Sequence, residues 1–268
     1  MVLQLLHAHT MAWFLLESNE HIDLEKTLFS GQTFSFKKTG VNLYSGVLGG
    51  AIITFRQVGD AVHYNYHKNM QSELASFFTL SIGHEALVER WNRAQKCIRF
   101  EYRGLRLLRC DLLETIFSFI CSSNNNIKRI TKMVDYLFSK GDFLGSVGGH
   151  RFHSFPPVQR LADIEGELRE RGFGYRAQYI CKTARKLQET ELGQNTSYAE
   201  VCKALMSLSG VGQKKRLDKQ TRSVIKKRYL ELFGSYAGIA QLFVFKDMLD
   251  RRMKSTGIVL EADAECPD

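Results

Sequence analysis

The 268-residue sequence lacks several features that would define a specialised class of protein. Only three prolines occur, so few positions interrupt long helices. None of the six cysteines belongs to a C-x-x-C pair, the spacing typical of zinc sites and iron–sulfur clusters, and buried reduced thiols are the simpler interpretation. No apolar run approaches the roughly 18 residues that a membrane-spanning helix needs. We therefore expect neither a zinc site nor an iron–sulfur cluster, and no membrane-spanning helix.

An excess of positive charge is the first positive indication. Lys and Arg outnumber Asp and Glu by 37 to 28, a net charge of +9, and 44% of the residues are hydrophobic. The hydrophobic fraction indicates a folded chain with a real core. The charge favours a polyanionic partner such as nucleic acid, although many basic proteins bind none. The apolar N-terminus MVLQLLHAHTMAWFLL begins without a basic stretch, so a cleaved secretory signal is not expected.

The segment over residues 41–67 alternates between apolar and polar residues. Gly49-Gly50 and Gly59-Asp60 divide it into three short runs rich in strand-forming residues. Two-residue turns of this kind join antiparallel neighbours. The sequence therefore predicts an antiparallel meander within an N-terminal β-rich domain over residues 1–72.

From about Glu73 onward, apolar residues recur at helical spacing, as in DLLETIFSFICSS and NNIKRITKMVDYLFSKG. This pattern predicts a mainly helical domain over residues 73–255, with a helix-hairpin-helix near 200–222. The last residues, 256–268, are typical of a frayed acidic tail. The fold class is therefore α+β, a small N-terminal antiparallel sheet followed by a helical body.

Two local features inside the helical part carry their own expectations. Ser122 and Ser123 precede the helix that carries Ile127, and serine is a common N-cap residue. Residues 145–150, GSVGGH, together with the proline pair that follows them, predict a loop between helices.

A glycine-containing turn, Leu208-Ser-Gly-Val-Gly, connects two amphipathic segments. Gly210 and Gly212 can adopt positive φ at low cost, and Val211 lies between them. A turn of this kind exposes backbone N–H groups near a helix N-terminus, which can bind a DNA phosphate without reading the base sequence. The same residues also suit a simple helix–helix turn, and the motif alone does not decide between the two.

Lys214 follows this turn by two residues, at the start of a strongly basic segment. The neighbouring cations Lys215 and Arg216 would lower the pKa of its amine, and a neutral amine is a good nucleophile. The simpler alternative is a lysine that neutralises phosphate in a solvated basic run. Beside a phosphate-binding turn, the basic segment favours contact with DNA.

Five stretches in order extend the argument: SGQTF, FSFICSSNNNIKRI, GFGYRAQY, SGVGQK and YAGIAQLFVF. Together they resemble the eukaryotic 8-oxoguanine DNA glycosylase/AP lyases of the helix-hairpin-helix glycosylase superfamily. The likeness runs from about Trp13 to Leu249. The resemblance implies removal of an oxidised guanine that is flipped out of bent duplex DNA into a pocket.

The resemblance assigns three residues to the flipped base. Gly31 would offer its carbonyl to the N7–H that 8-oxoguanine has and guanine lacks, Gln241 would bond the Watson–Crick edge, and Phe245 would stack on the ring. Without the resemblance, Gly31 is a turn glycine before a strand. Gln241 and Phe245, four residues apart, are then ordinary residues of an amphipathic helix.

The resemblance assigns further residues to the DNA itself. Asn124 would fill the gap in the duplex, Arg129 and Arg176 would hydrogen-bond the orphaned cytosine, and Tyr175 would wedge beside it. The turn would hold a phosphate through Gly210, Val211 and Gly212. Taken alone, the asparagine cluster is a helix-cap region and Tyr175-Arg176 joins a loop to a helix.

Lys214 matches the nucleophile of the family. It would attack C1′, release the base, form a Schiff base and allow β-elimination at the 3′ side, and no cofactor is implied. The implied partner is duplex DNA containing oxidised guanine, bound by a monomer that does not interact with membranes. The expected location is the nucleus, with the mitochondrion as a second compartment.

The chain departs from the family after Lys214. The family continues with a VADC-like stretch and a PVDVH segment, whose Asp helps activate the lysine and whose Cys helps sandwich the base. Neither segment occurs here, a pattern that indicates an internal deletion. Asp218, at i+4, would keep the amine protonated and is a poor substitute.

Four interpretations of the chain therefore stay open. The chain is an 8-oxoguanine glycosylase/lyase, or a glycosylase for another lesion such as an oxidised pyrimidine or an alkylated base. Otherwise it is a catalytically impaired relative that binds DNA lesions without turnover, or it folds poorly because a core helix is lost.

Overall fold

The structure is a computed structural model that describes residues 12–94, 100, 103–189, 198–211, 223, 226–227 and 230–243. The predicted site residues Gly212, Lys214 and Phe245 lie outside the described residues, as does most of the basic segment. Within the described ranges, none of the helices has the length and apolar character required to cross a bilayer.

The N-terminal sheet is antiparallel and has five strands in the order β1-β5-β4-β3-β2. The predicted meander is confirmed as β3 (Leu43–Leu48), β4 (Ala51–Val58) and β5 (Ala61–Asn65). Gly49 and Gly50 both have positive φ (59° and 79°), as a two-residue hairpin turn requires. The edge strands β1 (Trp13–Leu15) and β2 (Lys37–Gly40) were not predicted, because three or four residues carry too little alternation.

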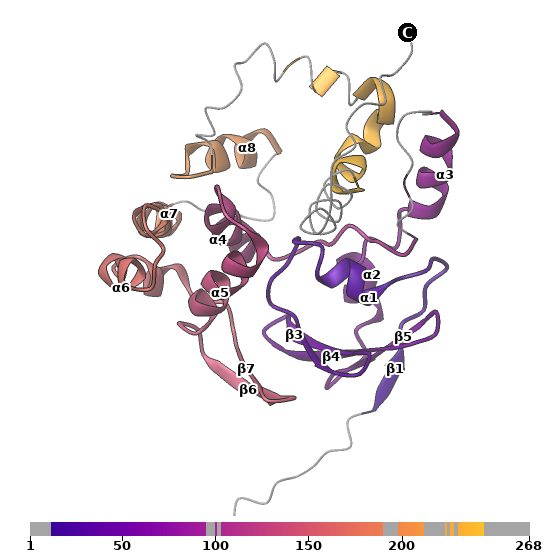
Figure 1. Cartoon of the computed structure of the whole chain (residues 1–268), viewed down its shortest axis with the longest axis horizontal. Coiled ribbons are helices and arrows are strands. Elements are labelled where there is room, and N and C mark those ends of the chain that lie inside the picture. The colour runs from indigo at the N-terminus through magenta and orange to yellow at the C-terminus, as the bar shows by residue number, and fades with distance from the viewer. Residues whose placement is uncertain are drawn as a thin grey trace, which may run out of the picture.

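One face of this sheet carries the N-terminal core. Phe55 and Tyr64 are fully buried and pack against helices α1 (Leu24–Leu28) and α2 (Gln71–Phe77), which lie together on that face (Figure 1). The same cluster extends to Leu108. The expected domain boundary at residue 72 therefore falls inside one packed unit, since α2 buries its apolar side on the sheet.

The helical part begins with α3 (His84–Ala94) and α4 (Leu112–Ser122) and continues to α8. It consists further of α5 (Ile127–Phe138), the 3-10 turn η1 (Val158–Leu161), α6 (Glu165–Glu170), α7 (Arg176–Gln188) and α8 (Tyr198–Ser207). A second core cluster joins α4, α5, α6 and α7. The predicted α+β class, a small antiparallel sheet followed by a helical body, is confirmed (Figure 1).

The predicted serine cap of α5 is wrong. Ser122 is the last residue of α4 and Ser123 is its C-cap, whereas Asn126 caps α5 by accepting a hydrogen bond from the Arg129 N–H at 3.0 Å. The Asn side chain reaches the third N–H of the helix as an N-cap should, and both serines lie too far upstream.

The loop predicted over residues 145–150 is instead a β-hairpin. Strands β6 (Phe143–Val147) and β7 (His150–His153) pair across Gly148 and Gly149, which both have positive φ. The prediction of a loop between helices is therefore wrong for residues 143–153, because the flanking strands are too short to be recognised from sequence. The hairpin packs against the N-terminal sheet, where Gly148 leaves no room for a side chain beside Thr39.

The C-terminal end of the described part packs against α3 and the residues that follow it. The helical residues 237–243 lie beside α3 (Figure 1). Trp91 of α3 packs edge-on against Phe100, Phe233 and Phe243 with ring centroids 5.4–6.3 Å apart. A third core cluster therefore fixes the segment that carries Gln241.

Candidate nucleic-acid interface

Two loops at the ends of helices form the centre of the candidate interface. The loop over residues 123–126 joins α4 to α5, and the loop over residues 171–175 joins α6 to α7. Asn124 is exposed and has a φ of 49°, a left-handed conformation that asparagine tolerates better than most residues. The structure brings together Asn124, Arg129, Tyr175 and Arg176, the residues that the resemblance assigned to the gap in the duplex and the orphaned cytosine.

Arg176 and Tyr175 hold the Asn124 loop by its backbone. The Arg176 guanidinium donates to the carbonyls of Ser123 and Asn124, the latter at 3.1 Å, and the Tyr175 hydroxyl donates to the Ser123 carbonyl at 3.0 Å. Arg176 is only 3% exposed. A contact between Arg176 and an orphaned base would therefore require its guanidinium to leave these carbonyls.

Arg129 connects the two loops from the other side. Its guanidinium donates to the Gly172 carbonyl at 2.7 Å while the side chain stays exposed. Tyr175 is 49% exposed, and its ring contacts the Arg176 guanidinium at 4.7 Å and the Tyr179 ring at 5.7 Å. An exposed, braced aromatic ring beside an exposed Asn is suited to enter a distorted duplex.

The turn after α8 is joined to these loops through α7. Gly210 has a φ of 81°, and a Cβ there would lie 2.9 Å from the Tyr179 ring. Thr183 donates to the Ser209 carbonyl at 3.1 Å. Val211 is the last residue of the turn that the structure describes. Tyr179 and Thr183 were not singled out from the sequence, because helical residues of α7 give no local signal for a contact with residues 209–210.

The surroundings of the two loops favour an anionic partner. Neither loop contains an acidic residue, and the exposed cations Lys128, Arg129 and Arg171 lie in or next to them. Positive side chains around an exposed polar loop attract phosphate. In the described part of the chain, no three His, Cys, Asp or Glu side chains gather as a metal ion would require.

Gly31 and Gln241 lie on separate elements. Gly31 has a φ of 86° in the turn after α1 and is half-buried. Gln241 is exposed on helical residues 237–243, between Ala240 and Leu242, which are buried in the third cluster. The contacts described for the two residues do not link them, so their assignment to one base pocket stays a prediction.

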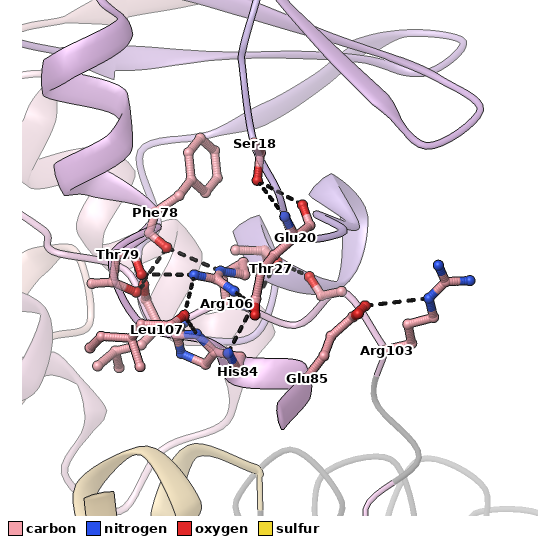
Figure 2. A network of polar contacts seen from close by, with 12 residues as sticks. Ser18, Glu20, Thr27, Phe78, Thr79, His84, Glu85, Arg103, Arg106 and Leu107 are labelled. Atoms are coloured by element: carbon pink, nitrogen blue, oxygen red, sulfur yellow. Dashed lines mark hydrogen bonds and ion pairs between the residues drawn. The ribbon is translucent and has the colours of Figure 1, made fainter. Parts of the chain in front are cut away.

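A buried polar network lies next to the segment that carries Gln241. Sequence reasoning missed this network. The Arg106 guanidinium, 1% exposed, pairs with Glu20 and donates to the carbonyls of Phe78, Thr79 and Ile82 (Figure 2). In the sequence, Arg106 belongs to the run RGLRLLR, where a basic residue is normally expected to be exposed. The network fixes the connection between α2 and α3.

His84 belongs to the same network at the start of α3 (Figure 2). Its Nδ1 lies 3.0 Å from the Ile82 carbonyl, and its Nε2 accepts from the Leu107 N–H at 3.4 Å. Burial and the nearby Arg106 lower the pKa of His84 to about 4. His84, Arg106 and Phe243 line a cavity of about 280 Å³, so the network reaches the C-terminal helical residues.

The fold and the two-loop site define a class of DNA repair protein. Residues 117–258, more than half of the chain, match the model of the HhH-GPD superfamily of base excision DNA repair proteins, and the chain belongs to that superfamily. Residues 14–116 match the N-terminal domain of 8-oxoguanine DNA glycosylase.

Two curated relatives indicate the particular branch. The chain is 41% identical over 228 residues to the N-glycosylase/DNA lyase OGG1 of Arabidopsis thaliana, covering 76% of this chain and 62% of the relative. It is 37% identical over 182 residues to the N-glycosylase/DNA lyase of Saccharomyces cerevisiae, covering 61% and 48%. The chain therefore spans about half to three-fifths of these relatives.

Solved structures show the same fold at lower identity. The 8-oxoguanine glycosylase/lyase of Clostridium acetobutylicum in its apo form superposes with a TM-score of 0.70 at 23% identity, over 87% of this chain and 95% of that one. The same enzyme in complex with double-stranded DNA containing cytosine opposite 8-oxoguanine gives 0.67 at 21% identity, over 89% and 98%.

Proposed function

We propose that this chain is a base-excision DNA glycosylase with AP lyase activity that removes 8-oxoguanine opposite cytosine. The observation that carries the proposal is the union of two features. The chain pairs an 8-oxoguanine glycosylase N-terminal domain with the repair superfamily domain in sequence order. The Asn124 loop and the Tyr175–Arg176 loop are tied together at one exposed point of the second domain.

The geometry of these loops suits the separation of a base from its partner. Asn124 projects from a loop whose carbonyls are held, so the side chain can enter a duplex without the backbone having to become ordered first. The exposed Tyr175 ring would wedge the neighbouring base step, and Arg129 would hydrogen-bond the orphaned cytosine. Gly210 and Val211, with Gly212, would hold the strand by a phosphate.

The chemical step is assigned to Lys214. Its amine would attack C1′ of the damaged nucleotide, and the C1′–N9 bond electrons would leave with the base. Gly31, Gln241 and Phe245 would hold the base during this step. Breaking of the C1′–O4′ bond would then open the sugar ring and give the Schiff base. Loss of a C2′ proton and of the 3′ C–O bond would complete β-elimination, and no cofactor takes part.

A second candidate function is lesion binding without excision. The observation that favours it is the sequence after Lys214, RLDKQTRSVIKKRYLELF, which contains no Asp segment of the kind that activates the lysine in the family. Without a carboxylate to stabilise the developing sugar cation, the chemical step would be slower by orders of magnitude while DNA contacts persist.

Borohydride trapping distinguishes the two candidates. The purified chain is incubated with duplex DNA carrying 8-oxoguanine opposite cytosine, and the Schiff base is reduced to a stable adduct. The matched controls are Lys214→Gln, an undamaged duplex, and a duplex with an abasic site opposite cytosine. We expect an adduct on the lesion duplex that the Lys214→Gln variant does not form.

Each other result has a defined meaning. Selective binding to the lesion duplex without any adduct supports the second candidate. Neither an adduct nor a preference for the lesion duplex would overturn both. The nucleus, with the mitochondrion as second compartment, and a monomeric state form part of the same proposal, and tagged localisation and light scattering test them.

A further inference from the structure

The residues on both sides of Gly31 are held in place by hydrogen bonds of their own. On its N-terminal side, the buried Ser30 hydroxyl donates to the Thr27 carbonyl at 2.8 Å. On its C-terminal side, Thr33 donates to Glu114 of α4 at 2.8 Å, and the Phe34 N–H points to the same carboxylate at 3.4 Å. No hydrogen bond of the Gly31 backbone is found among the described residues, so the turn presents this peptide unpaired.

Gln32 makes the contacts nearest to that peptide. Its side-chain Nε2 donates to the Ser30 Oγ and to the Arg106 carbonyl, both at 2.9 Å. Its Oε1 accepts from the Leu108 N–H, also at 2.9 Å. All three bonding positions of the half-buried amide that face the protein are therefore satisfied, and the amide has only one orientation that satisfies them.

The bond from Gln32 to Ser30 crosses over Gly31. It links the side chains of the two residues that flank Gly31, which has a φ of 86° and no side chain of its own to restrain it. The carbonyl of Gly31 belongs to the peptide plane that Gly31 shares with the backbone N–H of Gln32. Hydrogen bonds that hold the side-chain amide of Gln32 on residues 106 and 108 therefore limit the rotation of that carbonyl.

We propose that the Gln32 side chain is a positioning residue for base recognition: it clamps the Gly31 peptide so that the carbonyl points where a hydrogen-bond donor of the flipped base would lie. The inference rests on the proposed function and assigns its lesion selectivity to a residue that does not touch the base. A hydrogen bond discriminates strongly only when its acceptor is held in place beforehand.

The protein contains a matched control for this clamp. Gln57, on β4 in the same domain, also accepts one backbone N–H bond, from Leu24 at 3.0 Å. It also donates two bonds to carbonyls, those of Ile22 at 3.1 Å and Gly59 at 3.0 Å. Gln57→Met therefore removes one accepted and two donated hydrogen bonds, as Gln32→Met does, without disturbing the clamp on Gly31.

The experiment measures binding of both variants to three duplexes by fluorescence anisotropy, with 8-oxoguanine, guanine or an abasic site opposite cytosine. We expect Gln32→Met to lower the preference for 8-oxoguanine over guanine by about tenfold, the effect of one well-placed hydrogen bond. Affinity for the abasic duplex, which offers no base to Gly31, should stay within about twofold. Gln57→Met should keep the full preference.

Equal effects of the two variants on all three duplexes, or an unchanged preference in Gln32→Met, would overturn the clamp while leaving the proposed function intact. A wild-type chain with no preference for 8-oxoguanine would overturn the proposed function and the clamp with it. If Gln32→Met does not fold, Ser30→Ala removes the bond between Ser30 and Gln32, together with the bond from Ser30 to the Thr27 carbonyl, and leaves the bonds of Gln32 to residues 106 and 108 in place. The same loss of preference is expected from it, and its absence counts against the clamp.

Discussion

At the scale of single residues, the structure separates exposed functional groups from buried ones of the same type. Arg129 and Arg176 were assigned the same role from sequence, yet one guanidinium is exposed and the other is only 3% exposed and bonded to loop carbonyls. The difference arises because Arg176 is the first residue of α7 and points under the loop that it supports. Both guanidinium groups donate to loop carbonyls, and only three-dimensional packing shows which of the two arginines is exposed.

His84 gives a prediction at this scale. Its pKa of about 4 lies below the ordinary value of 6.5, because burial and the Arg106 charge disfavour the imidazolium, whereas Glu20 partly opposes them. Between pH 6.5 and 4, His84 is therefore protonated in the unfolded chain and neutral in the folded chain. Stability from this group is present above pH 6.5 and falls as the pH drops toward 4, by about 2–3 kcal/mol.

Urea unfolding at pH 7 and pH 4.5 checks this expectation. His84→Gln should show a smaller loss of unfolding free energy over that interval than wild type. His150→Gln, which replaces an exposed imidazole on β7, should follow wild type. A wild-type pH dependence that His84→Gln leaves unchanged would contradict the account.

At the scale of elements, turn and cap residues set where the strands and helices after residue 73 begin and end. The Gly148–Gly149 turn converts an expected loop into a hairpin that packs on the sheet. The Asn126 cap, in place of the expected serines, starts α5 after Asn124 and leaves Asn124 in the loop. In both cases a single turn or cap residue sets where a functional segment begins.

The two turn glycines of the hairpin make a matched pair of substitutions. Both have positive φ, so Gly148→Ala and Gly149→Ala should each cost about 1–3 kcal/mol in backbone strain. A Cβ at Gly148 would also lie 2.5 Å from the Thr39 carbonyl, whereas nothing lies within 4 Å of a Cβ at Gly149. Gly148→Ala should therefore be clearly less stable in thermal or urea unfolding. Equal losses would mean that the hairpin does not press on the sheet.

At the scale of the whole molecule, three core clusters link parts that are distant in sequence. The C-terminal residues Phe233 and Phe243 complete a core begun by Trp91 and Phe100 of the N-terminal half. The two matched family regions, residues 14–116 and 117–258, are therefore not independent folding units in this structure. The internal deletion expected after Lys214 stays a prediction, and a cooperative unfolding transition is the observation that would argue against a product that folds poorly.

Cooperative unfolding is the expected consequence. In a Trp13→Phe background, Trp91 is the sole tryptophan and reports on the third cluster, while far-ultraviolet circular dichroism reports on all helices. The two signals should give one coincident transition. Phe243→Ala, which empties a fully buried site, should lower the free energy of unfolding by about 3–5 kcal/mol. Separate transitions for the two signals would show that the C-terminal segment is not part of the common core.

The sequence by itself determined the local patterns: the alternation of the meander, the helical periodicity after residue 73, and the ordered motifs that name Asn124, Tyr175 and the 208–212 turn. These follow from neighbours along the chain, where period and turn chemistry act. The tertiary structure alone decided that α2 belongs with the sheet, that Arg106 is buried, and that Gln32 reaches across Gly31 to residues 106 and 108. Those outcomes depend on contacts between residues more than 70 positions apart in the case of Gln32, and no local pattern encodes them.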